Sequence, residues 1–169
     1  MRHLVVSVSL AAAGIAQSGA QPYWLIQSPS VSPSPRHAHS MAFDSTRRVV
    51  VLFGGWVNQY LADTWEWNGT AWAQRSPAAS PSARGYYSMI HDSVRQRTVL
   101  FGGWNGSYLG DTWEWDGTTW AQRAPAASPV PRSHHAMTYD SARQRTVLFG
   151  GGNGASLGDT WEWDGNTWT

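Results

Sequence analysis

Short runs of β-branched and aromatic residues alternate with turns along most of this chain, and the same order of runs occurs three times. The apolar run that ends in Phe53-Gly54-Gly55 recurs at 101–103 and at 149–151, 48 residues apart each time. Each copy is followed by Asp-Thr-Trp-Glu-Trp, which starts at residues 63, 111 and 159. A fixed period of this size is typical of repeat architectures, in which each unit buries its faces against copies of itself.

Four strands, which we name A to D, are predicted in each unit. In the first unit they span residues 39–43, 48–53, 63–67 and 70–74. Strand B is a continuous apolar run of the fully buried kind, and we expect the Gly54-Gly55 pair to end it. Asn68-Gly69, between strands C and D, predicts a two-residue type I′ hairpin turn, and Asp-Gly stands at the same place in the other units.

That turn would place Trp67 opposite Thr70 and Trp65 opposite Trp72. Because side chains alternate along a strand, three indoles of each unit are then expected on one face of the sheet. Three indoles need another sheet to cover them, which the next copy supplies. Thr64 and Glu66 fall on the opposite face, and the identical recurrence of the glutamate at 114 and 162 indicates hydrogen bonds between units rather than catalysis.

Small antiparallel sheets stacked face to face through aromatic residues are typical of β-propeller blades. We therefore expect an all-β fold with three four-stranded antiparallel blades, at 36–83, 84–131 and 132–169, that form an incomplete ring. The third blade ends within its strand D. Trp24 stands 48 residues before Trp72, so residues 23–27 are expected to form an orphan strand D, and 21–35 as a whole a Pro/Ser-rich lead-in. Ring closure then needs further blades of a longer protein, or a second copy of this chain.

These features resemble the kelch repeat over residues 23–169. The resemblance rests on the Gly-Gly pairs, the tryptophan of strand C, Pro-x-x-Arg before strand A and a period near 50. It implies a propeller but leaves function open, because kelch propellers serve many unrelated roles. The positions expected to have a structural role in the repeat are Gly54, Gly55, Trp65, Trp72, Gly102, Gly103, Trp113, Trp120, Gly150, Gly151, Trp161 and Trp168.

The composition excludes several types of functional site. The net charge is +1, so nothing in the overall charge points to nucleic acid. The chain has no cysteine, which excludes disulfides, thiolate metal sites and cysteine nucleophiles. His39 and His135 occupy matching strand A positions, but in blades two apart, so we expect no metal site. No catalytic residue and no cofactor are predicted.

The first twenty residues lie outside the repeat. Arg2 and His3 precede an apolar stretch from Leu4 to Ala16, and small residues follow up to Ala20. This order predicts a secretory signal peptide over residues 1–20, because the apolar stretch is too short for a membrane span. The mature protein is then expected to be secreted, periplasmic or on the cell surface, without a membrane span.

In a blade of this kind the B–C and D–A loops emerge at one end, which we call the mouth. The B–C loops differ between units: the first position is Trp, Trp and Gly, and the fifth is Tyr, Tyr and Ser. Aromatic and guanidinium groups around a mouth would suit a sugar or a peptide. In the alternative, the aromatic residues cap the blades and each arginine pairs with an aspartate as a structural tie. The candidate ligand-binding residues are Trp56, Tyr60, Trp104, Tyr108, Arg36, Arg84 and Arg132.

The leading hypothesis is a secreted kelch-repeat protein that binds a carbohydrate, a peptide or a protein through these loops. A second hypothesis is that the chain is part of a secreted propeller enzyme, because some kelch propellers resemble the central domain of galactose oxidase. The copper site of that family uses a tyrosine crosslinked to a cysteine, which this chain lacks. A third is a structural part of a surface adhesion protein.

Overall fold

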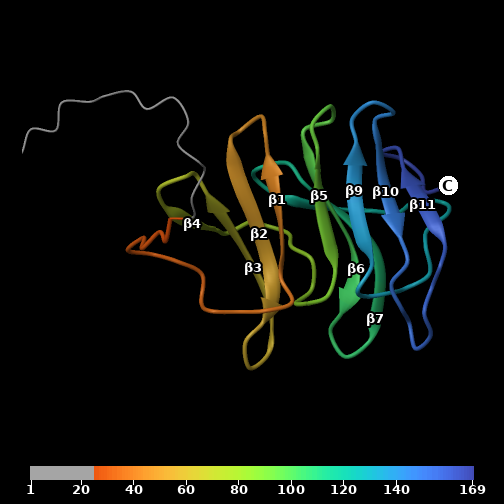
Figure 1. The fold of residues 1–169 in the computed structure, drawn as a ribbon, viewed down its shortest axis with the longest axis horizontal. Coiled ribbons are helices and arrows are strands. Elements are labelled where there is room, and N and C mark those ends of the chain that lie inside the picture. Colours follow the sequence, from red (N-terminus) through yellow and green to blue (C-terminus); the bar gives the residue numbers. More distant parts are fainter. Residues whose placement is uncertain (1–24) are drawn as a thin grey trace, which may run out of the picture.

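The computed structural model describes residues 25–169. The signal peptide predicted for residues 1–20 and the start of the predicted orphan strand lie outside the described residues. Eleven strands form three antiparallel sheets, and residues 25–169 contain no helix that could span a membrane. The expectation of an all-β fold built from antiparallel blades is confirmed (Figure 1).

The strands of each blade follow one another in space as they do in the sequence. Blade 1 consists of β1 (Ser40–Asp44), β2 (Val49–Trp56), β3 (Tyr60–Trp67) and β4 (Trp72–Arg75). Blade 2 consists of β5 (Ser88–Asp92), β6 (Arg97–Trp104), β7 (Tyr108–Trp115) and β8 (Trp120–Arg123). Blade 3 consists of β9 (Ala136–Asp140), β10 (Arg145–Phe149) and β11 (Thr160–Trp163).

The two ends of the described chain differ from a full blade. In blade 3, strand D is reduced to a bridge between Trp163 and Trp168, continued by two backbone hydrogen bonds between Glu162 and Thr169. At the other end, residues 25–27 of the predicted orphan strand form no strand. A strand D pairs with a strand C, and within residues 25–169 each strand C pairs with the strand D of its own blade.

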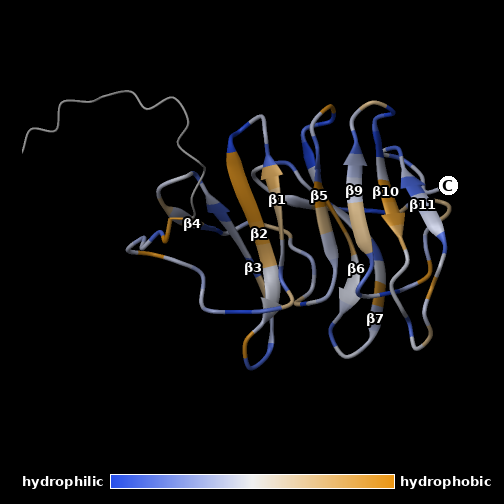
Figure 2. Ribbon diagram, viewed as in Figure 1, coloured by the Kyte–Doolittle hydropathy of each residue, from blue (hydrophilic) through white to orange (hydrophobic). Residues whose placement is uncertain are grey.

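The three blades lie side by side in Figure 1, with the first strand of each blade in contact with the first strand of the next. Strands β1, β5 and β9 therefore lie nearest to the axis of the ring, and β4 lies on the outside. The A–B loops are at the upper end of this view and the B–C loops at the lower end, which is the mouth. Apolar colour in Figure 2 is concentrated in the strands, most strongly in β2.

Two local predictions were wrong. Strand B does not end at Gly54-Gly55 in blade 1, because β2 continues to Trp56 after a register shift between Phe53 and Gly55. The same shift occurs in β6 between Phe101 and Gly103. The irregularity lets the strand pass through the glycine pair and extends the hairpin toward the mouth.

The turn between strands C and D also differs from the prediction. Trp67 pairs with Trp72 instead of Thr70, so the loop has four residues, 68–71, and not two. The side chain of Asn68 accepts hydrogen bonds from the backbone N–H groups of Thr70 and Ala71, and within the loop only Gly69 has a positive φ. The register moves by two residues, which keeps the indoles on the predicted face.

The hydrophobic core lies between blades. The indole face of blade 2 packs on the opposite face of blade 1, where Val51 and Phe53 are fully buried. Blade 3 packs on blade 2 in the same way, through Trp163 and Trp168. The ring of Phe53 meets that of Trp120 edge to face at 5.4 Å, and Phe101 meets Trp168 at 5.3 Å. Each blade therefore supplies the cover for the blade before it, as the sequence predicts.

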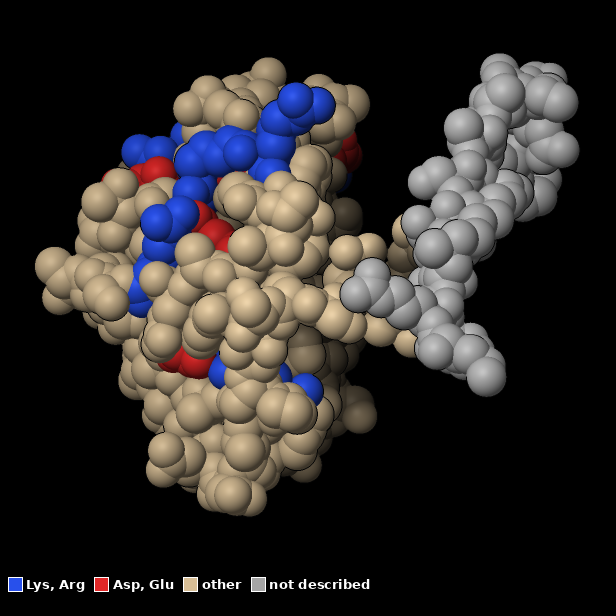
Figure 3. All heavy atoms as spheres, turned by 90° about the vertical axis from the view of Figure 1, so that its left-hand side faces the viewer, with Lys and Arg blue, Asp and Glu red and all other residues tan. Residues whose placement is uncertain are grey.

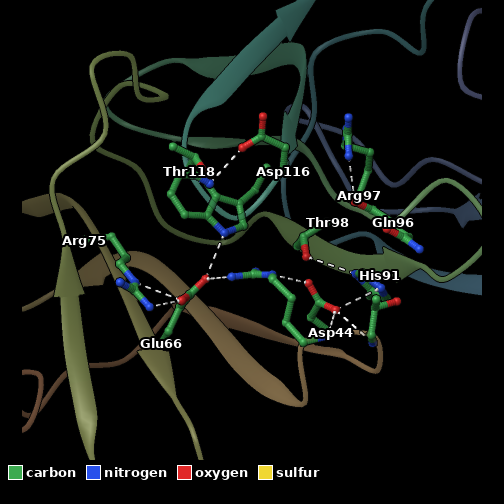
Figure 4. Close-up of polar contacts among 12 residues, drawn as sticks. Asp44, Glu66, Arg75, His91, Gln96, Arg97, Thr98, Asp116 and Thr118 are labelled. Atoms are coloured by element: carbon green, nitrogen blue, oxygen red, sulfur yellow. Dashed lines mark hydrogen bonds and ion pairs between the residues drawn. The ribbon is translucent and has the colours of Figure 1, made fainter.

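Hydrogen bonds across the same interfaces hold two indoles of each covering blade in place. The indole Nε1 of Trp115 donates to Glu66 at 3.1 Å, and that of Trp120 donates to Thr64 at 3.0 Å. Glu66 is buried and also accepts hydrogen bonds from Arg47 and Arg75 of its own blade (Figure 4). Blade 3 repeats the arrangement, with Trp163 on Glu114 at 3.1 Å and Trp168 on Thr112 at 2.9 Å. The predicted role of these glutamates between blades is confirmed for Glu66 and Glu114.

We expect Glu114→Gln to lower the free energy of unfolding by about 2–3 kcal/mol, because two guanidinium groups and one indole N–H lose a charged acceptor. Asp116→Asn is the matched control, since Asn68 occupies that turn position in blade 1. Its effect should stay within about 0.5 kcal/mol. Urea unfolding followed by tryptophan fluorescence measures both, and equal effects would contradict the inter-blade role of Glu114.

Candidate functional site

A hollow of about 980 Å³ lies at the mouth, on the side of blades 2 and 3. Its lining combines aromatic side chains with the glycine-rich loop that follows β10. The volume is at the upper end of the range for small-molecule sites. The lining includes Tyr60, Tyr86, Trp104, Tyr108 and His134, together with Ser133, Ser156 and small residues between 151 and 155.

The hollow exists because blade 3 lacks the aromatic pair that the other blades carry. In blade 1 the rings of Trp56 and Tyr60 meet edge to face at 4.5 Å, and in blade 2 those of Trp104 and Tyr108 do so at 4.6 Å. Blade 3 has Gly152 and Ser156 at these positions, joined only by an isolated bridge. The structure therefore brings three of the predicted aromatic residues, at 60, 104 and 108, to one site, while Trp56 does not line it.

Tyr86 and His134 were missed by the sequence analysis. Their rings stack at 4.5 Å with an angle of 26° between the planes, immediately before β5 and β9. Both residues have φ of 60°, in the left-handed region, and so does Ala38, with φ of 57°, at the same place in blade 1. The sequence did contain a signal for this position, because its side chain differs in every copy: Ala, Tyr and His.

Backbone hydrogen bonds around the axis fix these two side chains. The N–H of Tyr86 donates to the carbonyl of Ala38 at 2.9 Å, and the N–H of His134 donates to that of Tyr86 at 2.8 Å. The D–A segments of successive blades are thereby linked one to the next. Tyr86 and His134 are therefore positioned by main chain rather than by their own contacts with the core.

The three arginines point into the fold. The side chain of Arg84 is fully buried and forms a bidentate ion pair with Asp111, at 2.6 and 2.8 Å, and a further hydrogen bond to the carbonyl of Gly102. Arg36 pairs with Asp63 in the same way, and Arg132 with Asp159. None of the three lines the hollow. Their geometry agrees with the alternative interpretation, in which each arginine pairs with an aspartate as a structural tie.

This pairing lowers the pKa values of Asp63 and Asp111. Burial alone would raise the pKa of Asp111, but the hydrogen bonds and the charge of Arg84 outweigh it and hold the pKa below its usual range. The pKa of Asp63 is lowered by Arg36 against the same effect of burial. Both carboxylates therefore stay charged and bound to their arginines at neutral pH.

The glycine pairs allow the blades to approach closely at the mouth. A Cβ atom on Gly55, where φ is 98°, would lie 2.8 Å from the carbonyl oxygen of His37. Gly55 also joins two blades, because its N–H donates to the carbonyl of Arg84, in the D–A segment of blade 2, at 2.9 Å. Gly103 and Arg132 repeat this contact at 2.9 Å. A side chain at Gly54 or Gly102 would push the next D–A segment away, because its Cβ atom would lie 2.8 Å from the carbonyl oxygen of Arg84 or 2.7 Å from that of Arg132.

His135 is a buried histidine beside the hollow. Burial, and then the charge of Arg132, lower its pKa to about 4. Neither ring nitrogen has a hydrogen-bond partner among the described residues. No group of three or more His, Cys, Asp or Glu side chains within residues 25–169 could hold a metal ion. His135 therefore packs as a neutral ring, edge to face with Phe101 at 5.5 Å.

We expect His135→Tyr to flatten the pH dependence of stability between about pH 6.5 and 4. In this window the unfolded chain binds a proton that the folded His135 does not, so the free energy of unfolding falls as the pH falls. Tyrosine is compatible with the position, because Tyr87 occupies it in blade 2 and donates to the carbonyl of Phe53. Urea titrations at a series of pH values measure the slope. An unchanged slope in this window would contradict the burial of a neutral His135.

The family of the chain follows from this geometry together with one comparison. Over residues 21–169 the sequence matches the family model described as KLHDC2/KLHL20/DRC7 Kelch-repeats domain. A comparison with curated proteins found no match. The period of 48, the four-strand order of the blades and the match over most of the chain agree, so this chain belongs to the kelch-repeat family.

Proposed function

We propose that this chain is a binding module and that its ligand, a neutral saccharide, occupies the hollow at the mouth. Membership of the kelch-repeat family supports an interaction role. The observation that carries the proposal is the aromatic pair Trp104 and Tyr108, which borders the space that Gly152 and Ser156 leave open in blade 3. Aromatic rings beside an open hollow offer stacking surfaces that the fold itself does not use.

The chemistry of the lining favours an uncharged ligand. No Asp, Glu or Arg side chain lines the hollow, because the arginines at the mouth are paired inside the blades. The hydroxyl groups of three tyrosines and of Ser156 are available for hydrogen bonds, whereas that of Ser133 is bound to the His134 ring. A pyranose presents apolar faces that stack on aromatic rings and hydroxyl groups that pair with such donors and acceptors. A carboxylate or phosphate would find no guanidinium group there.

Charge on the molecule is concentrated at the opposite end. In Figure 3 the blue atoms gather at the upper end, and the lower end, the mouth, is almost entirely tan. The A–B loops and their flanks at the upper end carry Arg47, Arg48, Arg95, Arg97, Arg143 and Arg145. Three of these, Arg47, Arg95 and Arg143, are bound to the glutamates of their own blades. The uncharged mouth is therefore the better candidate for recognition of a neutral sugar.

A glycan array that contains neutral and acidic saccharides tests this proposal, with affinities then measured by calorimetry. Trp104→Ala should weaken binding by about tenfold or more, the loss of about 1.4 kcal/mol of stacking. Trp56→Ala is the matched control, because it removes an equivalent tryptophan that does not line the hollow. Binding to no neutral saccharide, or an equal loss in both variants, would contradict the proposal.

A second variant fills the hollow instead of emptying it. Gly152→Trp restores the residue found at this repeat position in blades 1 and 2. A Cβ atom there would lie 3.1 Å from the carbonyl oxygen of Ala155, a close contact that a small movement of the loop relieves. We expect this variant to fold and to lose saccharide binding. Full binding by Gly152→Trp would show that the ligand lies elsewhere.

Export is the second part of the proposal. It is supported by the basic start, the short apolar stretch and the small residues up to Ala20. Expression of the whole chain in a bacterial host, followed by mass spectrometry of the extracellular and periplasmic fractions, should give a mature N-terminus at Gln21. Retention in the cytoplasm with residues 1–20 still attached would contradict export.

A further inference from the structure

Among the described residues, each end blade has one core face that is partly exposed. In blade 1 this is the indole face, where Met41 is 50% exposed although its repeat equivalent Met89 is 4% exposed. In blade 3 it is the opposite face, where Phe149 is 57% exposed although Phe53 and Phe101 are fully buried. The residues of a core thus lie at the surface at both ends of the described chain.

The hydrogen-bonding groups on the two faces are also complementary. Glu162 and Thr160 on blade 3 stand where Glu66 and Thr64 stand on blade 1, and within residues 25–169 no indole donates to either. On blade 1, Trp67 and Trp72 stand where Trp115 and Trp120 donate in blade 2. One face therefore has the acceptors, and the other has the donors, of a contact that occurs twice inside the chain.

From this complementarity, we propose that the two faces bind each other between two copies of this chain, blade 1 of each copy on blade 3 of the other. The indoles of Trp67 and Trp72 then donate to Glu162 and Thr160, and the ring of Phe149 is covered by Trp72. A second copy is the occupant because this chain itself carries both halves of the contact. Two copies contribute six blades, which lies within the usual range for closed propellers.

Closure follows if each copy spans half of the ring. A head-to-tail contact generates a closed ring when its rotation closes, and an open filament when it does not. Two identical contacts related by a twofold axis would then bury both exposed faces and leave no open end. The axis of the ring would place the two mouth hollows on the same face of the disc.

The segment before blade 1 is compatible with this contact. Gln27 and Pro29 lie beside Met41, Val50, Trp67 and Trp72 around a cavity of about 230 Å³. Pro77 stands 48 residues after Pro29, in the connection between blades 1 and 2, and Ala79 of that connection accepts a hydrogen bond from the backbone of Trp120. The equivalent connection before blade 2 thus lies beside an indole face that is covered by another blade, so the segment at 27–29 does not prevent such a contact at blade 1. In Figure 3, which faces the blade 1 side, most atoms are tan; the charged atoms follow the upper end and the left-hand side, with a smaller group below the middle.

The mass of the full chain in solution, from sedimentation velocity and light scattering across a wide concentration range, tests the proposal. We expect the mass of two chains. Phe149→Glu and Met41→Glu each place a carboxylate in the contact and should reduce the mass to that of one chain. Val94→Glu is the matched control, because Val94 is 55% exposed in a loop of blade 2, and this variant should remain a dimer.

A mixture of the two disruptive variants separates head-to-tail pairing from other modes. Phe149→Glu keeps an intact blade 1 face and Met41→Glu keeps an intact blade 3 face, so the mixture should recover a one-to-one pair that neither variant forms alone. Circular dichroism of each variant verifies that the blades remain folded. A monomeric unmodified chain, an assembly of three or more chains, or a dimer that survives either variant would overturn the proposal.

Discussion

A buried carboxylate that accepts an indole N–H from the following blade is the contact on which this structure depends. Glu66 and Glu114 are almost completely removed from water, and each is neutralised by two arginines of its own blade. The remaining donor comes only from the next blade. Without the next blade the carboxylate keeps its arginines but loses its indole donor and its cover from water, as at the partly exposed Glu162, so a blade is complete only when another blade lies on it. Stability is then a sum over neighbouring pairs, as in other repeat proteins.

The mouth obeys a separate constraint. There the Arg–Asp pairs fix each D–A segment to its own blade, and the glycine pairs let the next segment form backbone hydrogen bonds at close range. These contacts involve main chain and buried side chains, and the tips of the B–C loops take no part in them. A loop tip can therefore lose its aromatic pair, as it does at Gly152 and Ser156, without loss of the ties beneath it. The hollow is a consequence of that freedom.

The period of 48 was enough to predict the strands, their order and the indole face, because each depends only on alternation and repetition. Details that depend on one side chain were not predictable in this way. Asn68-Gly69 favours a two-residue turn by composition, yet the amide of Asn68 binds two backbone N–H groups and stabilises a longer loop. Strand B passes through Gly54-Gly55 because the glycines accommodate a register shift that composition alone does not reveal. The pairing of each mouth arginine with an aspartate 27 residues away was one of the two alternatives that the sequence left open, and the contacts decide for it.

The site was predictable in part, and the reason lies in how the three units compare. All three copies meet the same folding requirement, so a residue that is identical in each, such as the arginine of the mouth, is explained by the fold. A side chain that differs among the three copies at one repeat position is not fixed by the fold. Three such positions, represented by Tyr86, Trp104 and Tyr108 in blade 2, converge at one hollow. Two of these positions lie in the B–C loop and were predicted; the third lies outside that loop and was not. In the proposed mode of binding, recognition therefore depends on where the units differ, and the packing of the blades depends on where they are the same.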